Sequence, residues 1–291
     1  MHTIIIYYGR IKKLQLMNKK TIFSLLFLLF IPMMFAQSYK RIISLAPSLT
    51  QSLYYLDTQD KLVGRTSYCV AAEKENVPVV ATAVKLNMEK AIAMKPDLVL
   101  VLGLTDAQDI ETLRKFGIKV EVFDSPKNFE EICDQFIHLG NLVGKRKEAK
   151  QIVADSKAKI SEIQKQRMGK PSPKIFFQVG SNPLFTVTPN TFMDDYITLI
   201  GGKNISAELT KGIIGREFVV AKNPDYIFIC TMGVTSDQET KVWKNYPSMN
   251  AVKNNRLFTI DADIACQPTP ITFVETMEVM NETMGGEAVE N

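Results

Sequence analysis

Cysteine and histidine are the side chains of this sequence best suited to nucleophilic or metal chemistry. The chain carries only a handful of them: Cys69, Cys133, Cys230, Cys266, His2 and His138. Their spacings match no zinc-site pattern, and the chain has no His-Glu-x-x-His, Gly-x-Ser-x-Gly or phosphate-loop motif. A catalytic dyad would have to combine His138 with Cys133, five residues earlier on one predicted helix. We interpret His138 as a packed helix residue, and we assign no catalytic residue, no metal ligand and no cofactor.

Two glutamates occupy matching positions in two distant parts of the chain. Glu89 is followed seven residues later by Pro96, and Glu217 is followed at the same distance by Pro224. Each glutamate lies in the first turn of a predicted short helix, where it stabilises the positive end of the helix dipole by about 0.3–1 kcal/mol. The repetition also favours a second reading, a matched pair of carboxylates on the molecular surface.

Short apolar strands alternate with helical patterns in both halves of the chain, which is typical of α/β folds. The run 98–102 is apolar without alternation, as expected for a strand covered on both faces. Strands are predicted in the first half at 42–46, 62–63, 79–80, 98–102 and 119–123. Strands are predicted in the second half at 174–179, 226–229 and 256–260, with a helix at 191–200. The pattern predicts two α/β lobes.

Between the two sets lies a long helical segment. Lys145–Arg167 has no Gly or Pro, and its apolar residues recur at spacings of three and four. At about 1.5 Å per residue the helix would be roughly 35 Å long, enough to join two lobes rigidly. An ordinary surface helix within one lobe is the alternative. The predicted boundaries are 37–144 for the first lobe, 145–170 for the joining helix and 171–291 for the second lobe.

The first 36 residues have the composition of a secretory signal peptide. Five basic and no acidic residues precede or flank a short apolar run at 22–31, which Pro32 interrupts and Ala36 closes. A membrane anchor is the alternative, but the run falls short of the ~20 apolar residues that a span needs. Met17 is a second candidate start. The first cysteine is Cys69, so we expect a periplasmic protein without a lipid anchor.

Charge gives little support for a nucleic-acid partner. The whole chain has a formal net charge of +4, and its 35 basic and 31 acidic residues include the five basic residues of the N-terminal segment. Without that segment the balance becomes slightly acidic, whereas nucleic-acid binding requires a basic patch or stripe.

Several segments resemble, in order and over nearly the whole mature chain, the periplasmic binding proteins for vitamin B12 and iron(III) siderophores. They are Arg41–Ser48, Leu62–Cys69, Lys95–Val99, Leu184–Thr186, Gly201–Ile205, Asn223–Ile227 and Asn254–Phe258. The resemblance implies the helical-backbone class of substrate-binding protein, in which one long rigid helix joins two α/β lobes and the ligand binds in the cleft between them. It also implies that Glu89 and Glu217 dock on the permease dimer of an ABC importer.

Residues at the carboxyl ends of strands are the candidates for lining the cleft, because open α/β sheets bind ligands there. From the first lobe this rule selects Ala46, Pro47, Ser48, Tyr68 and Cys69. From the second lobe it selects Phe185, Cys266, Gln267 and Cys230. Tyr68 and Phe185 offer flat apolar contact to a macrocycle, or else only seal the lobe edges.

Cys69 and Cys266 are expected to face the cleft from opposite lobes, and three interpretations remain open for them. They form a pair of soft ligands, a cross-lobe disulfide, or two small apolar contacts.

One departure from the family concerns the ligand. B12-binding members present tryptophans to the corrin, whereas this chain has Ala83-Val84 and Ile213-Ile214 around the matching places, and Trp243 lies elsewhere. The leading hypothesis is therefore a monomeric periplasmic receptor that delivers a metal chelate, such as a corrinoid, ferric siderophore or haem, to an ABC permease. The alternatives are an exported enzyme using His138 and Cys133, and a periplasmic scaffold.

Overall fold

The computed structural model describes residues 38–82, 85–230 and 236–285. The predicted signal peptide and Ala83-Val84 lie outside the described residues. Among the described residues, no helix combines the length and apolar content that crossing a bilayer demands.

The first sheet is fully parallel, with strand order β3-β2-β1-β4-β5. Its strands are β1 (Ile42–Ser44), β2 (Leu62–Thr66), β3 (Val79–Ala81), β4 (Leu98–Leu102) and β5 (Lys119–Phe123). The predicted strands at 98–102 and 119–123 are confirmed residue for residue. β4 lies between β1 and β5 and is covered on both faces, which explains its unbroken apolar sequence.

The second sheet has the order β10-β9-β6-β7, and β8 also pairs with β6. Its strands are β6 (Lys174–Ser181), β7 (Leu184–Thr186), β8 (Lys203–Asn204), β9 (Tyr226–Ile229) and β10 (Leu257–Thr259). β7 returns antiparallel to β6, whereas β8, β9 and β10 run parallel within the sheet. Each lobe thus has a central strand, β1 or β6, flanked by the strand that follows the Pro-Asp step.

Short helices cover the sheets. In the first lobe they are α3 (Pro47–Tyr55), α4 (Met88–Ala93) and α5 (Ala107–Lys115), with single turns at Gln59–Lys61 and Val70–Ala72. In the second lobe they are α8 (Phe192–Leu199), α9 (Arg216–Lys222), α10 (Ser236–Lys244), α11 (Asn250–Lys253) and α12 (Ala262–Ala265). Pro47 begins α3, where its fixed φ and missing N–H cost nothing.

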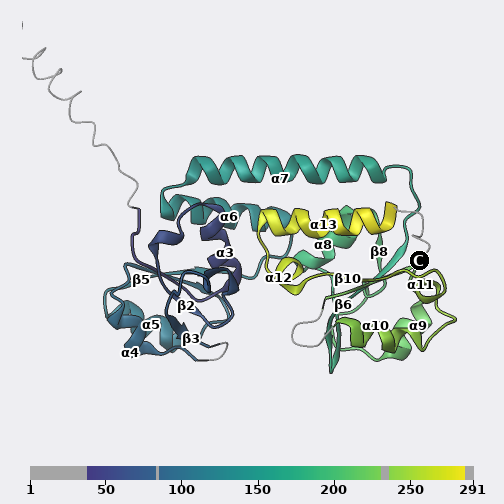
Figure 1. The fold of residues 1–291 in the computed structure, drawn as a ribbon, viewed down its shortest axis with the longest axis horizontal. Coiled ribbons are helices and arrows are strands. Elements are labelled where there is room, and N and C mark those ends of the chain that lie inside the picture. The colour runs from purple at the N-terminus through teal and green to yellow at the C-terminus, as the bar shows by residue number, and fades with distance from the viewer. Residues whose placement is uncertain (1–37, 83–84, 231–235, 286–291) are drawn as a thin grey trace, which may run out of the picture. The chain divides into compact units, whose positions relative to one another are not determined.

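Three longer helices form a layer along one side of both sheets: α6 (Phe129–Val143), α7 (Arg146–Arg167) and α13 (Pro270–Gly285). The long central helix is thereby confirmed, but it does not act alone, because α7 packs against both α6 and α13 (Figure 1). The buried face of α7 consists of Ala149, Val153, Ser156, Ile160 and Ile163.

Gly140 explains how closely the first two of these helices approach. A Cβ at this position would lie 2.5 Å from the Cβ of Ala149, so only glycine fits where α6 meets α7. One continuous apolar core then runs from Ile42 and Leu53 through Phe136 to Phe177 and Phe273. The helical layer and both sheets therefore share a core.

Candidate functional site

A pocket of about 330 Å³ is lined by residues of both lobes and of α6. Its volume lies in the usual range of small-molecule sites, about 300–1,000 Å³. The first lobe contributes Pro47, Ser48, Leu49, Ser52, Tyr68, Val70 and Leu102. The second lobe contributes Phe192, Ala262, Asp263, Cys266, Gln267, Pro268, Thr269 and Pro270. We expected a site at the strand ends between two lobes, and the structure has a pocket there.

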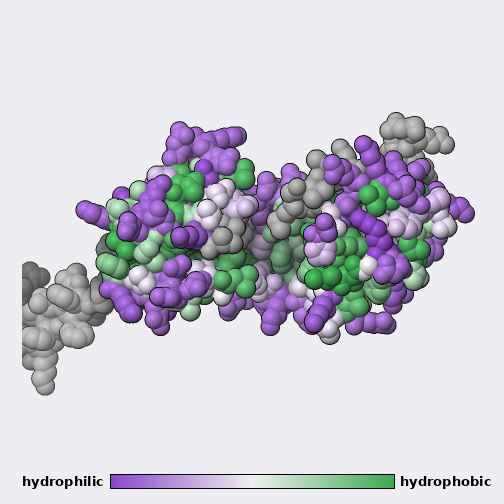
Figure 2. Space-filling model, turned by 90° about the horizontal axis from the view of Figure 1, so that it is seen from below, coloured by the Kyte–Doolittle hydropathy of each residue, from purple (hydrophilic) through white to green (hydrophobic). Residues whose placement is uncertain are grey.

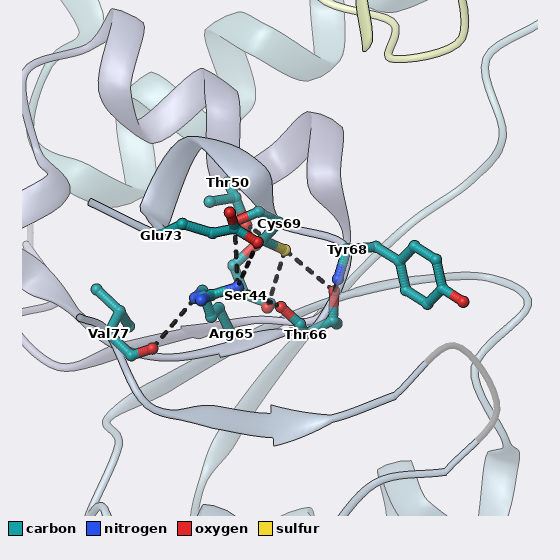
Figure 3. A network of polar contacts seen from close by, with 8 residues as sticks. All are labelled: Ser44, Thr50, Arg65, Thr66, Tyr68, Cys69, Glu73 and Val77. Carbon is teal, nitrogen blue, oxygen red and sulfur yellow. Dashed lines mark hydrogen bonds and ion pairs between the residues drawn. The ribbon is translucent and has the colours of Figure 1, made fainter. Parts of the chain in front are cut away.

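Tyr68 is the most prominent aromatic of the first-lobe wall. It belongs to the turn that follows β2, and 59% of its surface is exposed. Figure 3 shows its ring pointing away from the polar cluster that holds its main chain. The backbone N–H of Tyr68 donates to Thr66 Oγ1 at 3.2 Å, which fixes the direction in which the side chain leaves the turn.

The polar cluster behind Tyr68 is buried and centres on the thiol of Cys69. Cys69 Sγ lies 3.0 Å from Thr50 Oγ1 and 3.2 Å from Thr66 Oγ1, and Thr50 Oγ1 lies 2.8 Å from Ser44 Oγ. Ser44 and Thr50 are fully buried. The cluster connects the ends of β1 and β2 with the first turns of α3, so it fixes the position of the loop that carries Tyr68.

Arg65 completes this arrangement with hydrogen bonds to main-chain carbonyls. Its Nε donates to the carbonyl of Val77 at 3.1 Å, and its Nη1 donates to the carbonyls of Thr66 and Cys69 at 3.2 and 3.4 Å. Glu73 Oε1 lies 3.9 Å from the same Nη1. A guanidinium presents several donors in one rigid fork, so a single buried arginine holds both ends of the Tyr68 turn.

The second-lobe wall is the segment that joins α12 to α13. Thr269 and Thr272 are buried and hydrogen-bond to each other, with their Oγ1 atoms 2.9 Å apart. Thr272 Oγ1 also donates to the carbonyl of Gln267 at 2.6 Å, and Gln267 Nε2 donates to Asp263 Oδ1 at 2.8 Å. These bonds give the turn a defined conformation and place polar groups at the pocket.

The structure differs from the expectation that Cys69 and Cys266 face each other across the cleft. Cys69 is 1% exposed and does not line the pocket, because its thiol turns back toward Thr50 and Thr66. Cys266 does line the pocket, but its sulfur lies 3.1 Å from that of Cys230 in the same lobe. All four cysteines are free thiols, so no disulfide joins any of them.

Three other predicted lining residues lie outside the pocket, and one of them, Cys230, is fully buried. Ala46 is fully buried, because it is the residue immediately before α3 and belongs to the core. Phe185 is 42% exposed, but it sits on β7 beside Ile213, to which it is bridged, and not among the lining residues. Pro47, Ser48, Tyr68, Cys266 and Gln267 are the predicted residues that the structure brings together.

Residues of α6 and of the segment before it form a side of the pocket that sequence reasoning missed. They are Ser125, Pro126, Ile132, Gln135, Phe136 and Leu139. The strand-end rule cannot find residues on a helix that packs between the lobes. The available signal was the apolar stripe of α6, which contacts α8 and α13 as well as α7.

Asp263 is the charged side chain among the described lining residues, and it lies beside the amide of Gln267. No group of three or more His, Cys, Asp or Glu side chains that could hold a metal ion occurs within the described residues. The described lining is therefore mostly apolar, with amides, hydroxyls, one thiol and one carboxylate at defined places.

His138 and Cys133, which an enzyme would have to use, do not form a reactive pair. Burial raises the pKa of the Cys133 thiol to about 12, which keeps it protonated and unreactive. His138 is exposed, and its Nε2 lies 2.7 Å from Glu121 Oε1 on the outer side of α6. The thiol lies inside the core and the imidazole outside it.

The two matched glutamates lie where the sequence predicts. Glu89 is in the first turn of α4 and Glu217 in the first turn of α9, and both are exposed. Figure 1 shows α4 and α9 on the side of their sheets remote from α7. A Cβ at Gly215 would collide with Glu217 Oε1, so the carboxylate folds back over the start of its own helix.

Comparison with known proteins agrees with this architecture. The model of a family described as periplasmic binding protein matches residues 42–264. An uncharacterised ABC transporter substrate-binding lipoprotein of Bacillus subtilis is 30% identical, over 84% of this chain and 80% of its own length. A vitamin B12-binding protein of Vibrio cholerae is 27% identical, over 84% of this chain and 90% of its own.

A solved structure gives the same result. A periplasmic solute-binding protein of Staphylococcus epidermidis is 27% identical and superposes with a TM-score of 0.74, over 86% of this chain and all of the other.

Proposed function

The chain belongs to the periplasmic binding protein family, whose members are substrate-binding proteins and not enzymes, and on that premise we propose that it captures a metal chelate for an ABC importer. The observation that carries the proposal is the pocket lined by both lobes, with Tyr68 presented on a buried polar support. Such a site binds a flat ligand by apolar contact and orients it through a few polar groups.

The chemistry of the lining favours a corrinoid over an anionic ferric siderophore. Tyr68, Phe136 and Phe192 supply aromatic surface, and Gln135, Gln267 and Asp263 supply acceptors and donors. Amide side chains of a corrinoid donate to a carboxylate, whereas an anionic chelate would be repelled by Asp263. The B12-binding relatives support this choice. Ala83-Val84 and Ile213-Ile214 stand around the places where B12-binding members are expected to present tryptophans, which implies a contact geometry different from theirs.

Export by residues 1–36 is part of the proposal. The family supports a site of action outside the cytoplasm. One relative is named a lipoprotein, so the relatives do not support the expectation of a protein without a lipid anchor.

Docking on the permease dimer is assigned to Glu89 and Glu217. Two exposed carboxylates on equivalent helices match a two-fold basic surface, which provides orientation and a faster encounter more than affinity. Seen from the side that carries these helices, apolar surface also gathers on both lobes (Figure 2), as expected of a face that meets a partner.

Ligand binding is tested by mixing the mature protein with cobalamin, haem and ferric siderophores, followed by gel filtration and absorption spectroscopy. We expect cobalamin to co-elute with the protein. At a cobalamin concentration of 100 times the dissociation constant, binding should stabilise the folded protein by about 2.7 kcal/mol and so raise its melting temperature. If none of these chelates co-elutes or stabilises the protein, the proposal is overturned and a scaffolding role gains support.

A further inference from the structure

Cys230 and Cys266 form a close pair of thiols at the edge of the pocket. Cys230 directly follows β9 and is fully buried, whereas Cys266 is the residue after α12 and lines the pocket. Their sulfur atoms lie 3.1 Å apart, although the residues are 36 positions apart in the sequence. The other two cysteines are buried in separate clusters, Cys69 among hydroxyls and Cys133 within α6.

The main chain holds both members of the pair in place. The N–H of Cys230 donates to the carbonyl of Gln178 at 2.8 Å, which continues the sheet. The N–H of Cys266 donates to the carbonyl of Ala262 at 2.9 Å, which closes α12. A disulfide requires a separation of about 2.05 Å, so the two sulfurs need to move about 1 Å closer. Rotation about the two Cα–Cβ bonds supplies a movement of this size without unfolding either element.

The two thiols differ in reactivity. The hydrogen bond between them lowers the pKa of Cys266, and the same bond together with burial raises the pKa of Cys230. The thiolate is the attacking species in disulfide exchange, and access to the reagent also sets the rate. Cys266 is both the more acidic thiol and the one that faces the pocket.

We propose that Cys230 and Cys266 are a redox-active pair, which closes to a disulfide by exchange with a small-molecule disulfide that enters the pocket. The Cys266 thiolate attacks one sulfur of oxidised glutathione and releases one glutathione thiolate. The Cys230 thiol then loses its proton and attacks the Cys266 sulfur of this mixed disulfide, which releases the second glutathione thiolate. The two protons of the protein thiols end on the two glutathione molecules, so the protein is oxidised by two electrons and glutathione is reduced by two.

The bond would join the end of β9 to the α12–α13 segment, which is the second-lobe wall of the pocket. It therefore removes the one thiol that the described lining presents and ties that wall to the sheet. A disulfide that closes a loop of this length is expected to raise the melting temperature by about 5–10 °C.

The test uses the mature protein equilibrated with oxidised glutathione and then unfolded for thiol counting. The expected result is two free thiols, a mass lower by two hydrogens, and one cross-linked peptide pair containing Cys230 and Cys266. Cys133→Ala is the matched control, and it should form the same bond with one free thiol remaining. Four free thiols in the wild type, or a bond that contains Cys69 or Cys133, overturns the proposal.

Two variants test the order of the steps. Cys230→Ser should accumulate glutathione on Cys266, because the resolving thiol is missing. Cys266→Ser should remain without glutathione, because the buried Cys230 is not reached. Circular dichroism verifies that both variants are folded, and peptide mapping of the wild type decides the pairing even if one of them is not. Glutathione on Cys230 in the second variant contradicts the assigned order.

Discussion

Asp97 and Asp225 make equivalent hydrogen bonds in the two sheets. The Asp97 carboxylate accepts from the N–H groups of Lys40 and Arg41 at 2.8 and 2.9 Å, before the first residue of β1. The Asp225 carboxylate accepts from the N–H of Lys174 at 2.8 Å, at the first residue of β6. Each aspartate also donates its own N–H back to the opposite strand start.

This reciprocal pairing explains why the two Pro-Asp steps resemble each other in sequence. It fixes the central strand of each sheet to the strand that follows the step. α4 and α9 lie directly before these steps, so Glu89 and Glu217 are held in equivalent places relative to their own sheets. The sequence similarity between the two segments therefore has a structural cause, and this cause does not depend on what the glutamates bind.

Reversal of both docking charges should stop uptake and leave ligand binding unchanged. The double variant Glu89→Arg with Glu217→Arg places cations where a basic surface is expected to dock, so like charges oppose the encounter. Uptake of labelled ligand by cells and ligand affinity of the purified protein are the two measurements.

A matched control for this pair is Glu162→Arg with Glu282→Arg. These exposed glutamates lie on α7 and α13, in the helical layer, and the change of net charge is the same. Uptake should be retained by the control. Normal uptake by the Glu89 and Glu217 double variant would remove the docking assignment.

Removal of the Tyr68 ring should weaken ligand binding. Burial of an aromatic side chain contributes about 1.5–3 kcal/mol, so Tyr68→Ala is expected to raise the dissociation constant roughly 10- to 100-fold. Tyr68→Phe retains the ring and should lose much less. Phe116→Ala is the control, because Phe116 is similarly exposed at 62% but lies outside the pocket. Equal affinities of Tyr68→Ala and Phe116→Ala would contradict the assignment of Tyr68 to the binding site.

Arg65→Met should both destabilise the protein and weaken binding. The substitution leaves three main-chain carbonyls without the guanidinium donor, at a cost of about 2–3 kcal/mol in the free energy of unfolding. Because the Tyr68 turn then loses its support, affinity is expected to fall roughly tenfold, about 1.4 kcal/mol. Urea unfolding and ligand titration measure the two effects.

The comparison for Arg65 is Arg114→Met on the exposed face of α5, which should change stability by no more than about 0.5 kcal/mol. An Arg65→Met protein that is destabilised but binds with unchanged affinity would restrict Arg65 to a role in folding.

Glu121 should contribute to stability in a pH-dependent manner. Partial burial raises the pKa of Glu121, but hydrogen bonds from His138 and Lys119 outweigh it, so the pKa lies below its ordinary value of 4.5. A depressed carboxyl pKa stabilises the folded state above 4.5, and this contribution is lost as the pH falls through the lower folded value.

Glu121→Gln tests this by thermal melting between about pH 6 and pH 3, because amide has no charge to titrate. The melting temperature of the wild type should exceed that of the variant near pH 6, and the difference should shrink toward pH 3. The effect is no larger than about 1 kcal/mol, since the pair is partly solvated. Glu111→Gln, on exposed α5, is the control, and a constant difference at all pH values would contradict the prediction.

The elements of this fold were largely predictable because their signals are local. The apolar runs at β4 and β9, the Pro-Asp steps and the uninterrupted helical pattern of α7 each depend on neighbours within a few residues. The helical layer was predicted incompletely. Whether α6 and α13 pack on α7 depends on the path of the chain through the second lobe, which local periodicity does not encode.

The site was predictable only where a residue's place on the chain fixed its direction. Pro47, Ser48 and Tyr68 lie within a few residues of the ends of β1 and β2, so the strand-end rule located them. Cys69 is one residue further along the same turn, and its side chain points to the opposite side, into Thr50 and Thr66. A shift of one residue in a turn reverses the side-chain direction, and the sequence carries no signal for it.

The sequence by itself determined the α/β elements, the long helix, the matched glutamates and the resemblance to a family of transport receptors. Only the tertiary structure decided which side chains share the pocket, that α6 forms one of its sides, and that Cys266 lies against Cys230 instead of Cys69. The physical reason is the range over which the interactions act along the chain. Strand, helix and turn preferences act between neighbours, whereas a pocket and a thiol pair arise from side chains far apart in the chain, which are brought together only when the common core is packed.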